Sequence, residues 1–505
     1  MGTREAVEEQ ISQTRSHLAA IEAIDPEGLS PDVRFERDVE THHLRLELFE
    51  LEEHRVWERR STAMDGIGDP LFGLFAREFA PLDERLDSLA SRLEAIPRFL
   101  AEQRSRATKP QVGLWQQSEL ESAAEMPGFF DEIVTAGSGL AEPERRRLAT
   151  AADRAKAALV EYEGFLRATL ETAVDSWPLG RERYDQLVAL RAFDGLDADR
   201  IAQIGHEQLA LQRTARIAAA REIDPAVDES TVIGRIKADH PASFAEALDG
   251  YRTAMLRARQ FLIDHDIVSV PSNERIEVVP TPEYLRRVMP FAAYFDAPKF
   301  DAHPQGIYIV TPSPDGGASA MREHNYSSIS NTSIHEAYPG HHLQLSVAAR
   351  HASLSRLMAQ APEFIEGWGM YSEQMMREEG FDAAANFRLN MHTDAIWRAC
   401  RIVLDVRMHR GEIGVEEAIA WLIERTGFEP AHARAEVQRY TYTPTYQLSY
   451  LLGKIMLLQL RADERRRLGD AFSLRSFHNT LLRNGSLPIS FHRRQFAGEG
   501  ASAPA

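Results

Sequence analysis

The chain has 505 residues, 44% of them hydrophobic and 27% charged, a balance typical of a folded globular protein rather than a disordered one. Its formal net charge of -18, with no Lys- and Arg-rich run beside aromatic residues, argues against nucleic acid as a partner. The single cysteine, Cys400, excludes an intramolecular disulfide and a thiolate metal site, so any metal must be held by His and carboxylate side chains.

The first stretch of the chain, MGTREAVEEQISQTRSHLAA, is acidic and amphipathic. It lacks the apolar segment of a secretory signal, and no later stretch approaches the ~20 apolar residues of a membrane span. We therefore expect a cytoplasmic location and no membrane partner.

Residues 1–265 read almost entirely as helices. The segment PLDERLDSLASRLEAIPRFLAEQ, for example, places leucines at the three- and four-residue spacings of one buried helical stripe: Leu82, Leu86, Leu89 and Leu93. We expect this N-terminal half to form one helical wall of a cleft.

Short runs rich in β-branched and aromatic residues follow, bounded by proline and glycine: RIEVVPTP, FAAYFDAP and GIYIVTPSP. They predict a small sheet beside the cleft. The last run precedes the most informative motif of the chain, and two roles are open for it. It could be an edge strand that binds substrate backbone by strand addition, or it could simply cover the helix that follows.

Helical patterning returns from about Ser327 to about Leu482. The predicted fold is therefore mainly α, with a small sheet beside the active-site cleft. We expect an N-terminal half over 1–265, a second half with the chemical motifs over 266–490, and a disordered tail over 491–505.

The motif SIHEAYPGHHLQ begins like the zinc-binding pattern H-E-x-x-H, but Pro339 stands where the second His should be. On an ideal helix, residues four apart lie about 40° apart and about 6 Å along the axis, so they can share one metal ion. The next histidines, His341 and His342, come six and seven residues after His335. On a straight helix the first would point about 120° away and the second would lie about 10.5 Å distant.

The sequence does not predict a straight helix here. Pro339 cannot donate to the carbonyl of His335 and clashes with it, and Gly340 tolerates backbone angles that other residues avoid. If the chain loops out two extra residues, His341 takes the place of the second ligand. We prefer it to His342, which would then contact substrate or a ligand.

A site of two histidines and a carboxylate needs a third ligand, usually a Glu from a following helix. The stretch EFIEGWGMYSEQMMREEG supplies Glu366 as a candidate metal ligand and Glu373, seven residues later on the same helical face, to orient a ligating His. The alternative for either residue is a solvated or capping glutamate.

Further candidates lie towards the C-terminus. Tyr446 and Tyr450 are one helical turn apart and could stabilise an oxyanion, although plain core packing is the alternative. One helical face carries, at four-residue steps, Arg401, Asp405 and His409, a ladder that is either structural, which we prefer, or the source of a contact with a substrate carboxylate. His478 could contact substrate or a ligand, or be simply packed.

The segments HEAYPGHHLQ, EGWGMYSEQ, YTPTYQLSYLLGK and FHNTLLRNGSLPI together resemble the bacterial domain-of-unknown-function 885 family. That family is similar to helical glutamate-zincin metallopeptidases, such as the carboxypeptidase Taq and thimet oligopeptidase families. The resemblance implies one Zn²⁺ ion held by His335, His341 and Glu366, with Glu336 as the catalytic base.

The resulting hypothesis is a zinc-dependent hydrolase of short peptides, a carboxypeptidase, dipeptidase or oligopeptidase, with metal-activated water as the nucleophile. Two alternatives are open. One is a metal-dependent hydrolase of a non-peptide amide, and the other is a non-catalytic helical binding protein that has lost the metal because of Pro339.

Overall fold

The computed structural model describes residues 2–286, 289, 291–301, 303–312 and 320–499. The helices before the sheet are α1 (Arg4–Glu22), α2 (Pro31–Phe49), α3 (Ala63–Ala76), α4 (Leu82–Arg106), α5 (Gly113–Ala136), α6 (Glu142–Leu170), α7 (Arg181–Leu190), α8 (Ala198–Ile223), α9 (Glu229–Ala238) and α10 (Phe244–Asp264). Those after it are α11 (Tyr326–Glu336), α12 (His341–Ala348), α13 (Leu354–Met358), α14 (Pro362–Glu378), α15 (Ala385–His409), α16 (Val415–Thr426), α17 (Pro430–Tyr440), α18 (Ser449–Leu468), α19 (Leu474–Arg483) and α20 (Ile489–Phe496). The mainly α prediction is confirmed.

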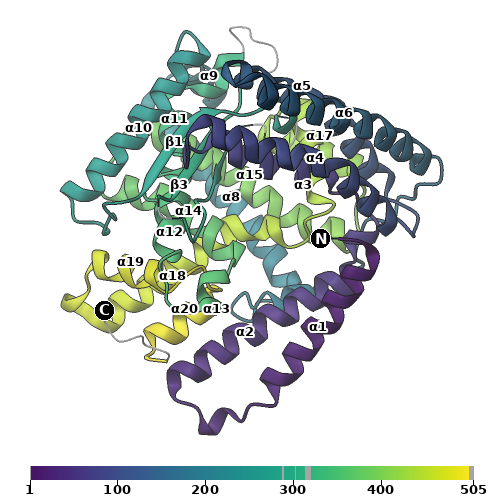
Figure 1. Ribbon diagram of the computed structural model, residues 1–505. Coiled ribbons are helices and arrows are strands. Elements are labelled where there is room, and N and C mark those ends of the chain that lie inside the picture. The colour runs from purple at the N-terminus through teal and green to yellow at the C-terminus, as the bar shows by residue number, and fades with distance from the viewer. Residues whose placement is uncertain (1, 287–288, 290, 302, 313–319, 500–505) are drawn as a thin grey trace. The chain divides into compact units, whose positions relative to one another are not determined.

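The small sheet has three strands, β1 (Arg275–Pro280), β2 (Ala292–Phe295) and β3 (Gln305–Val310), in the order β1-β3-β2. β1 runs parallel and β2 antiparallel to β3. The sheet was predicted correctly, but β3 is its central strand, with its backbone paired on both sides. It cannot extend the sheet with a substrate strand, so the strand-addition role is wrong. Figure 1 shows β1 and β3 beside α10 and α11.

The chain forms two compact units. Unit 1 contains Met1–Ala20, Leu44–Trp177 and Thr281–Met289, and unit 2 contains Ile21–His43, Pro178–Pro280 and Pro290–Ala505. The unit boundaries fall elsewhere than the expected division after residue 265, because α8 packs along α15 and so joins the later helices.

In unit 1, α3, α4, α5 and α6 pack on one another. The predicted leucine stripe of α4 is buried at Leu86, Leu89 and Leu93, whereas Leu82, the first residue of the helix, is 43% exposed. The stripe was therefore predicted correctly except at its first residue, Leu82, which stands at the helix end.

In unit 2, the chain continues as a helix beyond residue 490. α20 buries Phe491 in a small cluster with Phe35 and Val39. The expected disordered tail over 491–505 is therefore wrong for its first residues, because an apolar contact with α2 holds them. Residues 500–505 lie outside the described part of the chain.

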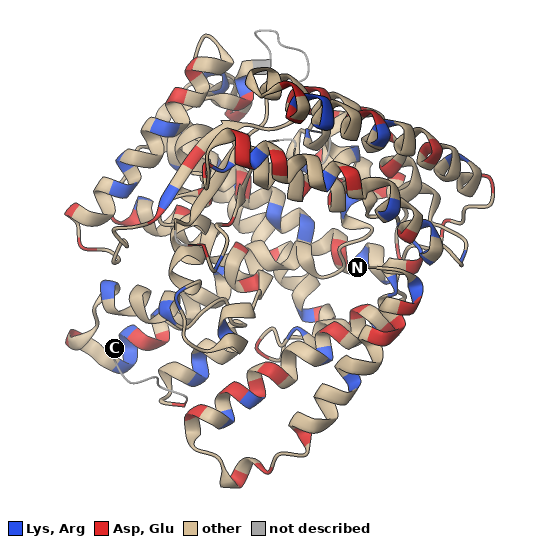
Figure 2. Cartoon of the chain, viewed as in Figure 1, with Lys and Arg blue, Asp and Glu red and all other residues tan. Residues whose placement is uncertain are grey.

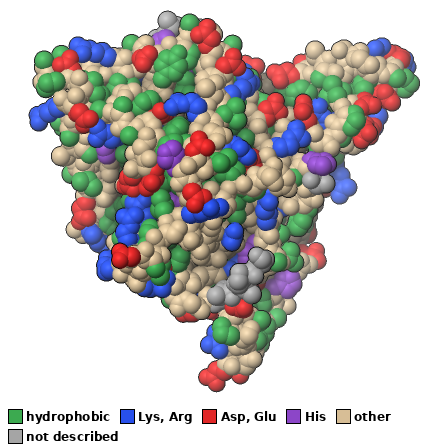
Figure 3. Space-filling model, turned by 90° about the vertical axis from the view of Figure 1, so that its left-hand side faces the viewer, with side chains coloured by type: hydrophobic (Ala, Val, Ile, Leu, Met, Phe, Trp, Pro, Cys, Tyr) green, Lys and Arg blue, Asp and Glu red, His purple; other side chains and the backbone are tan. Residues whose placement is uncertain are grey.

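Acidic and basic residues are interspersed along the helices in the view of Figure 2. The face drawn in Figure 3 likewise mixes hydrophobic, acidic and basic side chains. Within the described residues, no helix combines the length and the apolar character needed to cross a bilayer. The absence of a nucleic-acid partner stays a prediction.

Candidate functional site

The motif that begins at His335 is broken in the way its proline and glycine suggest. α11 ends at Glu336 and α12 begins at His341. Across the break, the amide of Gly340 donates to the carbonyl of Ile334 over 3.0 Å, a span of six residues instead of the helical four. Two residues are therefore looped out, and the chain resumes its helix at His341.

Gly340 is required by a close approach of two backbone segments. A Cβ atom on this residue would lie 1.8 Å from the carbonyl oxygen of His335. The indole of Trp368 on α14 donates to the carbonyl of Pro339 over 2.7 Å and so ties the loop to the helix that carries Glu366. The loop conformation thus depends on both its own glycine and a distant tryptophan.

The loop brings together the three residues expected to hold a metal ion. Nε2 of His341 lies 3.3 Å, and Nε2 of His335 lies 3.5 Å, from the same oxygen, Oε2 of Glu366. One ligand atom from each residue lies within 4.8 Å of the others, and all three side chains are buried. Ligands held about 2.0–2.1 Å from a tetrahedral zinc ion are about 3.3–3.4 Å apart, so the donor set and its spacing fit zinc.

The electrostatics of the cluster are strongly coupled. Burial by itself would raise the pKa of the Glu366 carboxyl, but His341 and His335 hold that pKa well below its usual range. Burial opposes a charge on His335, yet its hydrogen bonds with Glu366 and Glu373 raise its pKa to about 10. A cation bound here would displace that proton, since a ligating imidazole must be neutral.

Glu373 orients His335 from the side opposite Glu366. Its Oε1 lies 2.7 Å from Nδ1 of His335, and its Oε2 accepts a hydrogen bond of 2.9 Å from Asn331. Gly369, one turn before Glu373 on α14, makes room for the imidazole, because a Cβ there would lie 2.6 Å from a ring carbon of His335. The expected orienting role of Glu373 matches this arrangement.

Glu336, the predicted base, lies beside the cluster without belonging to it. Its Oε2 is 4.0 Å from Nε2 of His341, and the carboxylate accepts no hydrogen bond from the described residues. Burial raises the pKa of Glu336, although the positive charges of His341 and His335 oppose the rise.

The two predicted catalytic tyrosines have different surroundings. The hydroxyl of Tyr446 donates to Oε1 of Glu366 over 2.5 Å, so it holds the candidate ligand. The ring of Tyr450 packs edge-on against that of Tyr446 at 5.8 Å, and its hydroxyl makes no hydrogen bond with the described residues. Tyr450 is therefore the better placed of the two to donate to an oxyanion.

Two glycines allow α14 and α18 to cross closely. A Cβ on Gly367 would lie 2.6 Å from the backbone of Gly453, and a Cβ on Gly453 would lie 2.0 Å from the carbonyl oxygen of Glu363. The crossing places Tyr446, just before α18, against Glu366 on α14.

His342 lies next to His341 in the chain but is held by other partners. Its Nε2 is 2.7 Å from Oε2 of Glu274, and its Nδ1 is 3.0 Å from the hydroxyl of Tyr294 on β2. Since both ring nitrogens are engaged, His342 is not placed as a ligand. A Cβ on Gly306 would collide with Tyr294, so this glycine of β3 makes that contact possible.

Arg401 lies on α15 and is only 2% exposed. Its Nη2 contacts Oε2 of Glu436 at 2.7 Å, and its Nε donates to the hydroxyl of Tyr440, both on α17. Of the expected ladder, Asp405 lies 4.0 Å from His409, whereas Arg401 pairs with Glu436 on α17 instead of Asp405. Arg401 also lies 4.7 Å from the ring of Tyr450, so it supports the site by packing rather than by contact with the metal cluster.

His478 is a packed residue. Its Nδ1 lies 2.9 Å from the carbonyl of Ile267, and its Nε2 lies 2.8 Å from the hydroxyl of Tyr371. A carbonyl can only accept, so Nδ1 carries the proton and Nε2 accepts from the tyrosine. Burial lowers the pKa of His478 to about 4. Of the two roles that the sequence left open for His478, these two internal bonds match simple packing rather than contact with substrate or a ligand.

Several residues around the site were missed by sequence reasoning. Asn331 stands one helical turn before His335, a spacing that could have drawn attention to it. Asp394 accepts a hydrogen bond from Asn331 over 2.8 Å, and Arg398 follows Asp394 by one turn on α15. Glu274 had no local signal, because it lies 68 residues before His342 in the chain.

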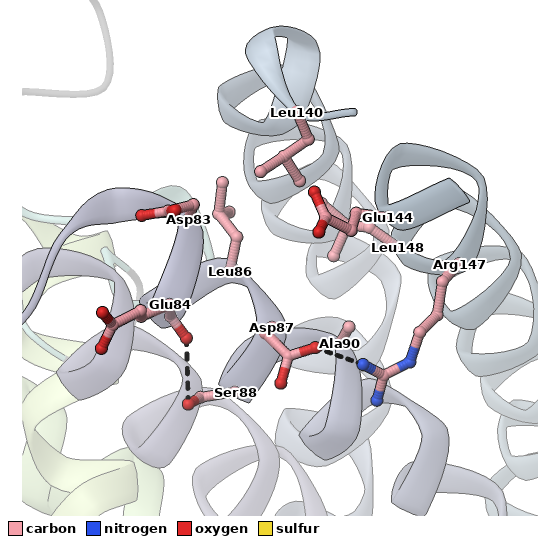
Figure 4. Close-up of a pocket in the computed structure, with 10 residues that line it drawn as sticks. All are labelled: Asp83, Glu84, Leu86, Asp87, Ser88, Ala90, Leu140, Glu144, Arg147 and Leu148. Atoms are coloured by element: carbon pink, nitrogen blue, oxygen red, sulfur yellow. Dashed lines mark hydrogen bonds and ion pairs between the residues drawn. The ribbon is translucent and has the colours of Figure 1, made fainter. Parts of the chain in front are cut away.

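A separate hollow lies in unit 1, between α4 and α6 (Figure 4). Arg147 reaches across it to Asp87, and the same guanidinium bonds Glu94. None of the described residues that line it is a histidine, so its residues support an ion pair between helices rather than a metal site.

The comparisons with known proteins place the chain in a family. The profile described as "Bacterial protein of unknown function (DUF885)" matches residues 2–495. No curated protein matches the chain significantly. The resemblance to glutamate zincins stays a prediction.

Two solved structures are similar throughout their length. One is "a putative lipoprotein of unknown function" from Shewanella oneidensis, with 22% identity, a TM-score of 0.75, and coverage of 98% of this chain and 93% of that one. The other is "the putative lipoprotein" from Colwellia psychrerythraea, with 20% identity, a TM-score of 0.82, and coverage of 98% and 91%. At these identities the likeness concerns the fold alone. By its family match, the chain belongs to the DUF885 family of bacterial proteins of unknown function.

Proposed function

We propose that the protein is a zinc-dependent hydrolase of peptide bonds that acts on short peptides as a carboxypeptidase, dipeptidase or oligopeptidase. The observation that carries the proposal is the placement of His335, His341 and Glu366, whose ligand atoms have the spacing of a tetrahedral zinc site. A zinc ion held there would supply a Lewis acid that activates water and polarises a carbonyl group.

The chain's own residues supply the remaining chemistry. Glu336, whose carboxylate has no hydrogen-bond donor among the described residues, takes a proton from the attacking water and delivers it to the leaving amine. Tyr450 donates its unused hydroxyl to the oxygen on which negative charge develops. Tyr446 and Glu373 hold Glu366 and His335 in position.

The test combines metal analysis of the purified protein with a panel of short peptides whose ends are free or blocked. Glu336→Gln should retain zinc and lose turnover by about 10²–10⁴-fold, since only the proton transfer is removed. Glu366→Ala should lose zinc. Glu379→Gln, at an exposed carboxylate near the end of the same helix, serves as the control for both variants.

Two outcomes would count against the proposal. A protein without bound zinc, whose stability does not change with a chelator, would favour the non-catalytic binding protein. Full zinc occupancy in Glu366→Ala would show that another residue supplies the third ligand.

The place of action is a proposal of its own. The two similar structures are described as lipoproteins, while we expect this chain in the cytoplasm. Fractionation of cells that make the full-length protein distinguishes the two locations, and recovery in the membrane fraction would overturn the cytoplasmic one.

A further inference from the structure

Arg398 on α15 is joined to the candidate metal ligands by two routes. On one side, its Nη1 lies 3.6 Å from Asp394, which leads through two hydrogen-bonded side chains to His335. On the other side, its guanidinium lies 5.9 Å from the ring of Tyr450, which packs on the tyrosine that donates to Glu366. Arg398 therefore borders the same site as the predicted base and the oxyanion donor.

Two donor atoms of the Arg398 guanidinium are shielded from solvent without a hydrogen-bond partner, although the side chain as a whole is 14% exposed. Its Nε and Nη1 are shielded from solvent and make no hydrogen bond with the described residues. Stacking 3.9 Å over the ring of Trp397 fixes its plane and leaves its donor edge unused. A shielded donor without a partner is unfavourable, so this arrangement is one that a ligand would relieve.

The neighbouring arginines do not lack partners in the same way. Glu436 contacts Arg401 at 2.7 Å and Arg439 at 3.1 Å, so one carboxylate serves both. Burial raises the pKa of Tyr450, and the charges of all three arginines oppose that rise. Around Tyr450, Arg401 and Arg439 thus share the carboxylate of Glu436, whereas the carboxylate nearest to Arg398 is Asp394, at 3.6 Å, beyond hydrogen-bonding distance.

We propose that Arg398 binds the C-terminal carboxylate of the substrate, so that the protein removes residues from a free C-terminus. The inference rests on the proposed peptide hydrolysis and names its substrate class. A guanidinium presents its donors in a planar fork that matches a carboxylate with two parallel hydrogen bonds. Arg401, for which the sequence left such a contact open as the alternative, is unsuited because its Nη2 already contacts Glu436 and its Nε donates to Tyr440.

The test measures binding separately from turnover. Glu336→Gln protein is titrated by calorimetry with three probes: the tripeptide Ala-Ala-Phe, its C-terminal amide, and Ala-Ala-Glu amide. The free acid should bind about 10–100-fold more tightly than its amide, the range for a hydrogen bond to a charged group. Adding Arg398→Gln should abolish that difference, and Arg398→Lys should retain part of it.

Arg425→Gln is the matched control. Arg425 stacks 4.0 Å over Trp421, as Arg398 does over Trp397, but its donors bond to Trp421 and Glu424. This variant should keep the preference for the free acid. Melting curves of each variant identify any loss of fold, and if Arg398→Gln unfolds, Arg398→Lys carries the comparison.

The outcomes separate this inference from the proposed function. Equal binding of acid and amide overturns the role of Arg398, even if both peptides are hydrolysed. Tight, Arg398-dependent binding of the acid without any hydrolysis by the unmodified enzyme supports the anchor and counts against the peptidase. Tighter binding of Ala-Ala-Glu amide than of Ala-Ala-Phe overturns the C-terminal assignment in favour of an acidic side chain.

Discussion

The imidazole of His335 has a partner on each of its ring nitrogens, Glu366 at Nε2 and Glu373 at Nδ1. A carboxylate on the second nitrogen fixes the tautomer of a ligating histidine and makes it a better donor to metal. His341 differs, since its buried Nδ1 has no hydrogen-bond partner among the described residues. Of the two histidines, His335 is therefore the one whose affinity for a metal ion depends on a side chain that can be substituted, that of Glu373.

Glu373→Gln should weaken zinc binding by about 10–100-fold, because a neutral amide accepts the Nδ1 hydrogen bond of the ligating imidazole less strongly than a carboxylate and so makes the ring a poorer donor to metal. Competition with a chromogenic chelator measures the change. Glu379→Gln, at the exposed residue that follows α14, should leave the affinity unaltered. Equal affinities for all three proteins would show that Glu373 does not act on the metal site.

Asp405 allows a prediction on pH. Its Oδ2 accepts hydrogen bonds from Tyr184 and from the amide of Thr445, yet burial raises its pKa to about 7. Since the folded pKa lies above the unfolded one, its contribution to stability is present in acid and is lost as pH rises towards 7. When the pH is raised from 5 to 8, the free energy of unfolding of Asp405→Asn should therefore increase by roughly 3 kcal/mol relative to that of the native protein.

Urea unfolding at the two pH values measures this difference. The exposed Asp239 provides the control, as Asp239→Asn. If the difference in free energy of unfolding between Asp405→Asn and the native protein stays constant with pH, the raised pKa of Asp405 is contradicted.

At the scale of elements, the site depends on where helices stop and how closely they cross. The loop at Pro339 and Gly340 separates α11 from α12, which would otherwise continue as one helix. The same loop places His341 where it could bind the ion that His335 would bind. The Gly367 and Gly453 pair then lets α18 approach α14. Small residues are placed where a side chain would push the ligands apart.

Gly340→Ala tests the loop directly. The new Cβ would lie 1.8 Å from the carbonyl oxygen of His335, so the backbone must shift. The free energy of unfolding should fall by about 1–3 kcal/mol or more, the range typical of overpacking. Zinc content and the free energy of unfolding should both fall. In Gly414→Ala, at the start of α16, the new Cβ meets no atom within 4 Å, and both quantities should be retained. Native zinc content in Gly340→Ala would disprove the role of the loop.

At the scale of the whole molecule, the candidate ligands join α11, α12 and α14 within unit 2. An ion that binds only the folded state stabilises it by about 2.7 kcal/mol at one hundred times its dissociation constant. Zinc should therefore raise the melting temperature of the native protein, and a chelator should lower it. The melting temperature of Glu366→Ala should change with neither zinc nor chelator. A native protein whose melting temperature is equally unchanged would show that zinc binding does not stabilise the fold.

The sequence alone determined the mainly helical class and the small sheet, because helical period and β-branched runs are local signals. Its proline-broken motif favoured His341 over His342 beside His335, and Glu366 was a candidate that the family resemblance supported. The sequence could not determine that β3 is central or that Glu274 binds His342. Nor could it show that Glu436 engages Arg401, while Nε and Nη1 of Arg398 make no hydrogen bond with any described residue. Those facts depend on which side chains meet across segments far apart in the chain, and only tertiary packing decides such meetings.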